Sequence, residues 1–170
     1  MKYTEEILKS WTSPLSQTEE QRVENTVLMI KDAVTSYDKL SDCTMEIFAQ
    51  GSYANNTNVR QNSDVDICVM LTSTFFLQLV DGKTDIDYGY TAGSITYSDY
   101  KSYIVEALKK KFGNNVVAVG NKSIDIKSNS YHVNADVVPT FQYRDFKIIS
   151  STDPIKYVEG VKYVARMVQK

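Results

Sequence analysis

The sequence predicts an α/β (α+β) domain in which a mixed, twisted β-sheet is flanked by a long N-terminal helix and a second helix. Two segments, 16–39 and 98–112, repeat apolar residues at helical spacing, and short β-prone runs lie between and after them. A chain of 170 residues is long enough for one domain with its own hydrophobic core.

The first helix is predicted over residues 16–39. Its apolar side chains recur every three or four residues, as on the buried face of an amphipathic helix: Val23, Val27, Ile30, Val34 and Tyr37. Ser16 with Glu19 fits a capping box at its start. The pair Thr18 and Gln21 is an alternative. A long helix therefore precedes the first strand.

The first two strands are predicted over residues 44–49 and 65–71, separated by a polar loop that reaches Ser63. The segment 72–97 is left unassigned, because its apolar part, FFLQLV, fits a strand or a short helix equally well. The second helix follows over residues 98–112. Gly113 is expected to end it in the left-handed conformation.

Three further strands are predicted over residues 116–119, 123–127 and 131–138. Ser128 and Asn129 fit a hairpin turn between the last two, and Pro139 is expected to close the final strand because it has no N–H to donate. The tail from 154 to 170 stays open: its apolar spacing fits a helix, which Gly160 weakens.

Composition narrows the classes of function. Apolar and charged contents of 42% and 24% are typical of a soluble protein, and no apolar run is long enough to cross a membrane. The first residues, MKYTEEILKSW, do not resemble a signal peptide, so a cytoplasmic location is expected. Cys43 and Cys68 lack the spacing of a zinc site or a disulfide framework.

The charge pattern argues against binding to a nucleic-acid backbone, which usually requires a basic surface. The formal net charge is −2. The basic cluster at residues 109–111 falls at the end of the second predicted helix, where cations complement the helix dipole. We therefore interpret that cluster as structural.

Asp64 and Asp66 are the sharpest chemical feature of the sequence. They lie two residues apart at the start of a predicted strand, so their side chains share a face. Neighbouring carboxylates repel each other unless a cation lies between them, and magnesium prefers oxygen ligands of this kind. Asp136, near the end of the run YHVNADVVP, is the predicted third carboxylate. All three are expected to be both metal ligands and catalytic residues.

Other groups near the predicted site compete with this assignment. Asp125 alternates with two isoleucines and is predicted to face solvent, and Asp145 is predicted to lie on the surface. His132 falls on the same predicted face as Asp136 but about 13 Å along the strand, so a carboxylate is the preferred base. Three tyrosines are candidates for stacking on a nucleobase: Tyr88, Tyr90 and Tyr97.

Gly51 and Ser52 supply a place for a triphosphate. Glycine lets the backbone approach phosphates closely, and consecutive N–H groups in a turn form an anion-binding concavity. The serine hydroxyl adds a donor. Together with the preceding Gln50, these residues are the predicted nucleotide-binding segment.

The stretch QGSYANNTNVRQNSDVDICVML resembles the signature of polymerase-beta-type nucleotidyltransferases, and NADVVPTF resembles the strand that carries their third metal ligand. The long leading helix, the form QGSYAxxT and the ending DVVPTF are together similar to the CD-NTases. These are bacterial relatives of cyclic GMP-AMP synthase and oligoadenylate synthetase.

The resemblance implies a polymerase-beta-like nucleotidyltransferase core holding two Mg²⁺ (or Mn²⁺) ions. It implies an enzyme that joins nucleoside triphosphates, ATP, GTP or another, into a cyclic or linear oligonucleotide second messenger. The role implied is bacterial antiphage (CBASS-type) signalling, with no DNA or RNA activator and no membrane partner expected. Because members of the CD-NTase family are roughly twice as long, residues 1–150 are predicted to be the catalytic domain. Residues 151–170 would then begin a helical lobe that this chain lacks, or that a partner chain replaces.

Two alternatives remain open from the sequence. One is transfer of a nucleotide to another acceptor, such as an RNA end, a protein hydroxyl or a small-molecule hydroxyl. The other is a non-catalytic nucleotide-binding module that keeps the fold.

Overall fold

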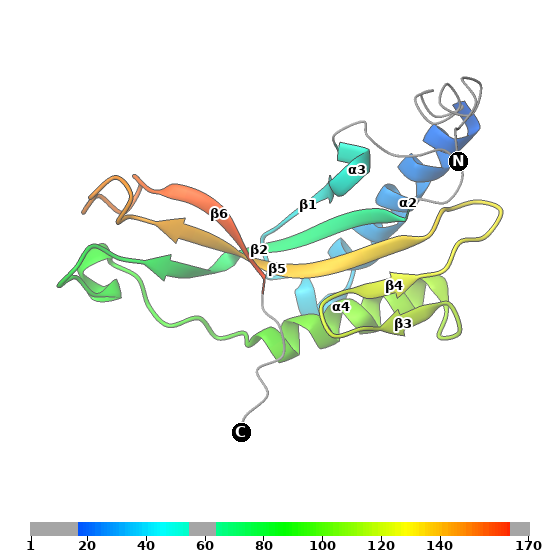
Figure 1. Cartoon of the computed structure of the whole chain (residues 1–170). Coiled ribbons are helices and arrows are strands. Elements are labelled where there is room, and N and C mark those ends of the chain that lie inside the picture. Colours follow the sequence, from blue (N-terminus) through cyan, green and yellow to red (C-terminus); the bar gives the residue numbers. More distant parts are fainter. Residues whose placement is uncertain (1–16, 55–63, 164–170) are drawn as a thin grey trace, which may run out of the picture.

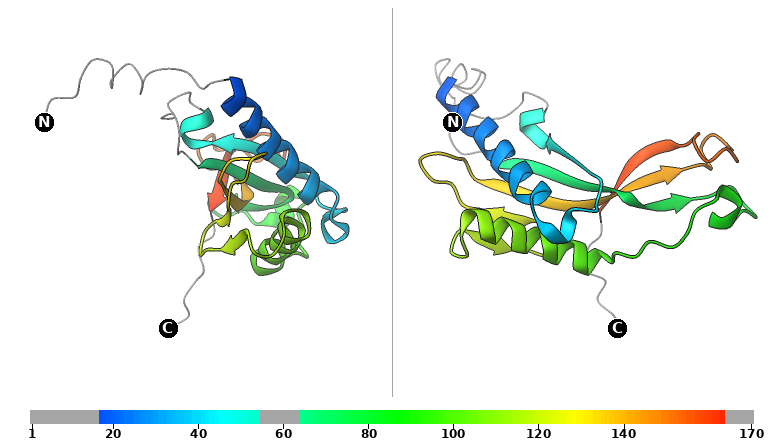
Figure 2. Two further views of the ribbon diagram at one scale, coloured as in Figure 1. Left: turned by 90° about the vertical axis from the view of Figure 1, so that its right-hand side faces the viewer. Right: turned by 180° about the vertical axis from the view of Figure 1, so that it is seen from behind.

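The computed structural model describes residues 17–54 and 64–163. One mixed sheet forms the centre, and the two long helices, α2 (Gln17–Thr35) and α4 (Tyr97–Phe112), lie together on one side of it (Figures 1 and 2). The predicted fold class is confirmed. Among the described residues, no helix is both long enough and apolar enough to cross a membrane.

Helix α2 ends earlier than predicted, at Thr35 rather than near residue 39. The hydroxyls of Thr35 and Ser36 donate to the carbonyls of Lys31 and Asp32 at 2.8 and 2.6 Å, and such bonds compete with the helical backbone. A 3₁₀ turn, η1 (Asp38–Leu40), follows and buries Leu40. Of the capping residues considered, Ser16 lies outside the described residues and Thr18 lies within the helix.

The sheet contains six strands in the described part of the chain. Their bounds are β1 (Met45–Gln50), β2 (Val65–Gln78), β3 (Val117–Val119), β4 (Ile124–Ile126), β5 (Ala135–Asp145) and β6 (Val158–Tyr163). The order is β1-β2-β5-β4-β3, with β6 also paired to β5. Strands β2 and β5 are parallel, and all other pairs are antiparallel.

Strand β2 is longer than predicted, and β5 begins at Ala135 rather than at residue 131 and continues beyond residue 138 to Asp145. The unassigned segment 72–97 continues β2 to Gln78 after a register shift between Leu71 and Phe75, and then forms the 3₁₀ turn η2 (Asp85–Tyr88). The later parts of β2 and β5 extend beyond the helices together with β6 and the turn η2 (Figure 1). We call this part of the molecule the arm.

Pro139 does not end strand β5, contrary to the prediction. Strand β4 pairs with β5 up to Val137, and β6 begins its pairing at Thr140. Both strands use the edge of β5 that faces away from β2, so Pro139 falls between them. A missing N–H therefore costs no ladder hydrogen bond there.

Within the tail, Val158–Tyr163 forms strand β6 rather than the helix that the apolar spacing allowed, and it pairs with β5. Residues 164–170 lie outside the described residues. The domain boundary at residue 150 stays a prediction, although the first strand beyond it joins the same sheet.

Helix α4 matches its prediction closely. The side chain of Thr96 accepts a hydrogen bond from the Asp99 N–H at 3.1 Å and caps the first turn. Gly113 ends the helix with a positive φ of 97°, but its ψ of 151° is not that of the expected left-handed cap. The lysines at 109–111 occupy the last turn, as predicted.

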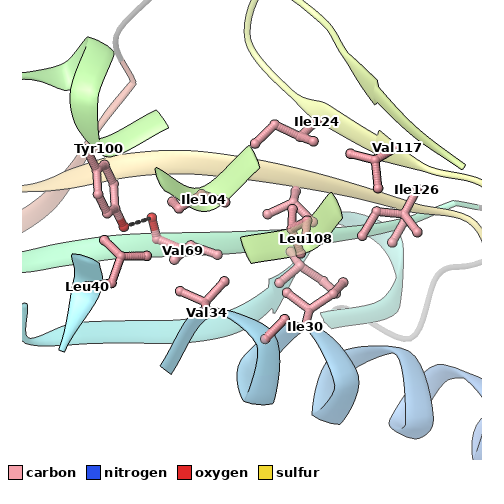
Figure 3. Close-up of a cluster of buried hydrophobic side chains, with 14 of the residues drawn as sticks. Ile30, Val34, Leu40, Val69, Tyr100, Ile104, Leu108, Val117, Ile124 and Ile126 are labelled. Carbon is pink, nitrogen blue, oxygen red and sulfur yellow. Dashed lines mark hydrogen bonds between the residues drawn. The ribbon is translucent and has the colours of Figure 1, made fainter. Parts of the chain in front are cut away.

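The main core lies between the helices and one face of the sheet (Figure 3). Alternate residues of β2, from Val65 to Leu71, pack against apolar side chains of both helices. Tyr100, fully buried, donates a hydrogen bond to the Val69 carbonyl at 3.0 Å. The helices therefore cover one face of the central part of the sheet.

Replacing Tyr100 by phenylalanine is expected to lower the free energy of unfolding by about 1–2 kcal/mol, because a buried hydrogen bond is lost without a change in shape. Urea unfolding monitored by circular dichroism measures this. Tyr131→Phe is the matched control, since that side chain is 58% exposed, and its effect should stay within about 0.5 kcal/mol. Equal losses of unfolding free energy in the two variants would contradict a stabilising role for the Tyr100 hydrogen bond.

Candidate active site

The face of the sheet opposite the helices carries a row of carboxylates. Asp66 of β2 is the register partner of Asp136 of β5, and Asp136 is the partner of Asp125 of β4. Partners on neighbouring strands point to the same face, about 4.8 Å apart. We call these three residues the acid row. It brings together two carboxylates that the sequence predicted and one that it did not.

Gln50 and Asp64 extend this arrangement. Gln50, the last residue of β1, is the register partner of Asp66. Asp64 immediately precedes β2 and is exposed. It lines a surface depression together with Asp125 and Asp136. All three predicted acids therefore lie at the same end of the sheet and on its open face.

Gly51 lies directly against the carboxylate of Asp66. It begins the short helix α3 (Gly51–Ala54) with a φ of +66°, and a Cβ added there would lie 2.3 Å from Asp66 Oδ2. Glycine is therefore required for two reasons, the left-handed backbone and the close approach. The Gly51–Ser52 segment is thus placed beside the acids, as predicted. The structure does not describe the Ser52 side chain.

Burial and neighbouring carboxylates both disfavour the ionised form of Asp136. Its pKa is raised from the ordinary value of 3.8, first by burial and then by the carboxylates of Asp125, Asp64 and Asp66. The Asp125 carboxylate is close enough to share a hydrogen bond with protonated Asp136. A divalent cation would relieve this repulsion.

Sequence reasoning missed Asp125 and Tyr53. Asp125 was predicted to face solvent, but it is half-buried in the acid row and accepts a hydrogen bond from Ser123 Oγ at 2.8 Å. Its alternation with two isoleucines was the available signal, because it put Asp125 on the face opposite the core. Tyr53 lies in α3, two residues after Gly51, and the pKa of its phenol is raised by burial and by the carboxylates of Glu19 and Asp64.

The donor set fits a magnesium or manganese site in its chemistry. Such ions prefer carboxylate oxygens and keep positions for water and phosphate. Among residues 17–54 and 64–163, no three acidic, histidine or cysteine side chains are already gathered closely enough to hold an ion. The backbone brings the acids together, and their side chains would close around the ion on binding.

Other predicted residues lie elsewhere. His132 is buried before β5 begins, with its ring edge-on to Phe112, so it is not on the face of Asp136. Tyr97 packs on Phe141, on the helix side. Tyr88 and Tyr90 contact Phe146 in the arm. Asp145, predicted to lie on the surface, is half-buried at the end of β5, where it accepts hydrogen bonds from two backbone N–H groups.

Asp136→Asn is expected to raise the melting temperature in EDTA at neutral pH, because it removes a carboxylate whose charged form is disfavoured first by burial and then by the neighbouring carboxylates. A raised pKa means that the folded state binds the proton more tightly than the unfolded state. The wild-type penalty is therefore absent below the ordinary aspartate pKa of 3.8 and appears as the pH rises through the folded-state pKa. Thermal melts from pH 4 to 7 should show the gap between variant and wild type widening with pH.

Asp145→Asn is the matched control for that experiment, because the same change falls on the same strand. Asp145 accepts its two backbone hydrogen bonds without a neighbouring acid in the row, so no stabilisation is expected there. A lower melting temperature for Asp136→Asn in EDTA would contradict the repulsion described above.

Residues 29–158 match the family described as nucleotidyltransferase domain, and the chain belongs to that family. A curated relative, the cyclic dipyrimidine nucleotide synthase CdnE of Cecembia lonarensis, is 45% identical over 162 residues, which cover 95% of this chain and 53% of the relative. The cyclic GMP-AMP synthase CdnE03 of Staphylococcus schleiferi is 37% identical over 184 residues, covering 95% and 57%. The chain thus spans about half the length of these relatives.

The fold is similar to that of a solved structure of Rhodothermus marinus CdnE c-UMP-AMP synthase with Apcpp and Upnpp. The TM-score is 0.79 at 28% identity, and the match covers 96% of this chain and 53% of that one. The resemblance to the CD-NTases and the polymerase-beta-like fold are therefore both confirmed. The roles of the individual site residues stay predictions.

Proposed function

We propose that this chain is the catalytic part of a nucleotidyltransferase that joins nucleoside triphosphates into a cyclic or linear oligonucleotide second messenger. The observation that carries the proposal is the acid row on the open face of the sheet, with Gly51 packed against Asp66. The family and the CdnE relatives support it.

Asp64, Asp66 and Asp136 would hold two Mg²⁺ or Mn²⁺ ions. Bound there, such ions would neutralise the charge that develops on the reacting phosphate oxygens. Gln50, Gly51 and Ser52 would bind the donor nucleotide, because the backbone at Gly51 is open to close approach by phosphates. Asp64 and Asp66 would fix the position of the triphosphate relative to this segment.

Asp136 would accept the proton of the attacking ribose hydroxyl. The hydroxyl oxygen forms a bond to the α-phosphorus of the donor nucleotide, the bond from that phosphorus to the bridging oxygen breaks, and pyrophosphate leaves. A second transfer between the joined nucleotides would close a ring.

The choice of nucleotides is expected to include pyrimidines, because a relative with 45% identity is named as a cyclic dipyrimidine synthase. Relatives with other products make a test of all four nucleotides necessary. Cytoplasmic antiphage signalling of the CBASS type, without a DNA or RNA activator, is the role we propose. A helical lobe or partner chain would complete the nucleotide pocket.

The test is incubation of the protein with pairs of radiolabelled nucleoside triphosphates and Mg²⁺ or Mn²⁺, followed by phosphatase treatment and mass spectrometry. A phosphatase-resistant dinucleotide or oligonucleotide is expected. Nucleotide binding without any product would instead favour a non-catalytic module. A product formed only with an added RNA, protein or small-molecule hydroxyl would favour transfer to another acceptor.

A further inference from the structure

We propose that Tyr163 is a positioning residue that forms an aromatic shelf for the base of a nucleoside triphosphate whose phosphates lie at the acid row. The inference rests on the proposed function and goes beyond it, because it assigns base binding to strand β6. Its support is the place of Tyr163 in the sheet, the hydrogen bond that directs its ring, and the surface between the ring and the acids.

Tyr163 lies on the same face of the sheet as the acid row. It is the last described residue of β6 and the register partner of Thr140 on β5. Thr140 follows Asp136 by four residues on the same strand, so their side chains share a face, with Cα atoms about 13 Å apart. Tyr163 therefore stands on the open face, along the strand from the acids.

A hydrogen bond directs the Tyr163 side chain toward the acids. Its hydroxyl donates to Gln50 Oε1 at 3.1 Å, and Gln50 is the register partner of Asp66. The ring must therefore lean across β5 and β2 to reach β1. It nevertheless stays 54% exposed, so part of the aromatic surface is open.

The surface between the ring and the acid row carries no charge. The residues of that face are Cys68, Val138 and Thr140. Cys68 Sγ and Thr140 Oγ1 are hydrogen-bonded to each other at 3.0 Å in the interior. Only Val138 of these three is partly exposed, because Cys68 and Thr140 are fully buried. No charged group therefore separates the acid row from the exposed part of the Tyr163 ring along this strand.

The chemistry at the acid row and the chemistry at Tyr163 match the two ends of a nucleotide. The acid row suits the metal-bound phosphates, and an exposed tyrosine ring suits the flat face of a base. Stacking on an aromatic side chain tolerates every base. The shelf would therefore set the position of the base and add affinity, without by itself selecting one base.

Calorimetry with the full 170-residue chain and Mn²⁺ tests the inference. Two probes are compared: non-hydrolysable nucleoside triphosphates and inorganic tripolyphosphate. Tyr163→Leu should weaken binding of the nucleotides about tenfold or more, the expected loss for one stacked base, and leave tripolyphosphate binding unchanged. Tyr163→Phe, which keeps the ring, should retain most of the nucleotide affinity. Tyr131→Leu is the matched control, because that tyrosine is similarly exposed but lies in the loop before β5, and it should change neither affinity.

The other outcomes overturn the inference in distinguishable ways. Equal nucleotide affinity for wild type and Tyr163→Leu removes the shelf but leaves the proposed function standing. Parallel loss of nucleotide and tripolyphosphate binding in Tyr163→Leu shows a structural role instead. Failure of the wild type to bind either probe contradicts the proposed function, and the shelf with it.

Discussion

Replacing Asp64 and Asp66 together by alanine is expected to reduce nucleotidyl transfer at least about 10³-fold. Asp64 immediately precedes β2, and the Asp66 carboxylate lies against Gly51, where the donor phosphates are proposed to bind. Electrostatic stabilisation of a reacting phosphate by bound metal is worth several kcal/mol, and about 4 kcal/mol corresponds to a factor of roughly 10³ in rate. The rate of product formation at saturating Mg²⁺ measures the effect.

The control is Asp85→Ala with Asp87→Ala, because it removes two aspartates with the same spacing from the 3₁₀ turn η2 in the arm. That variant changes the net charge equally and should keep its activity. The fold of the test variant should persist in thermal melts, since the change relieves repulsion. Comparable loss of activity in both double variants would contradict the role assigned to Asp64 and Asp66.

Gly51→Ala is expected to reduce kcat/KM at least about 100-fold. The new methyl group would lie 2.3 Å from Asp66 Oδ2, so the carboxylate must move, and a displacement of about 1 Å in a catalytic group can cost that much. The backbone strain at a φ of +66° adds a cost of about 1–2 kcal/mol to folding. Steady-state kinetics and urea unfolding measure the two effects separately.

Gly82→Ala separates the clash from the strain. Gly82 also has a positive φ, +79°, but a Cβ there would meet nothing within 4 Å. The two variants should lose similar stability, while only Gly51→Ala should lose activity. If Gly82→Ala lost activity equally, backbone strain rather than contact with Asp66 would explain the effect.

Local patterns in the sequence were enough to predict the helices and the position of the acid pair. Helix α4 appears where its apolar spacing indicated, and Asp64 and Asp66 occupy the predicted end of β2. These features depend on residues a few positions apart. The amphipathic face and the alternation of a strand are both readable at that range.

The features that the sequence did not reveal depend on pairing between distant segments. Asp125 joins the acid row only because β4 pairs with β5 in one register, and a shift of one residue would turn it to the other face. Pro139 is tolerated within β5 because two different strands share that edge. Strand β6 was open to a helical reading until its partner was known.

The most direct test of the central claim is a crystal structure of this protein with Mn²⁺ and a non-hydrolysable nucleoside triphosphate, with anomalous scattering used to locate the metal. We expect two manganese peaks in contact with the carboxylates of Asp64 and Asp66, at least one of them also contacting Asp136, and the phosphates beside Gly51. A nucleotide bound elsewhere, or manganese absent from these carboxylates at full nucleotide occupancy, would contradict the proposed two-metal site.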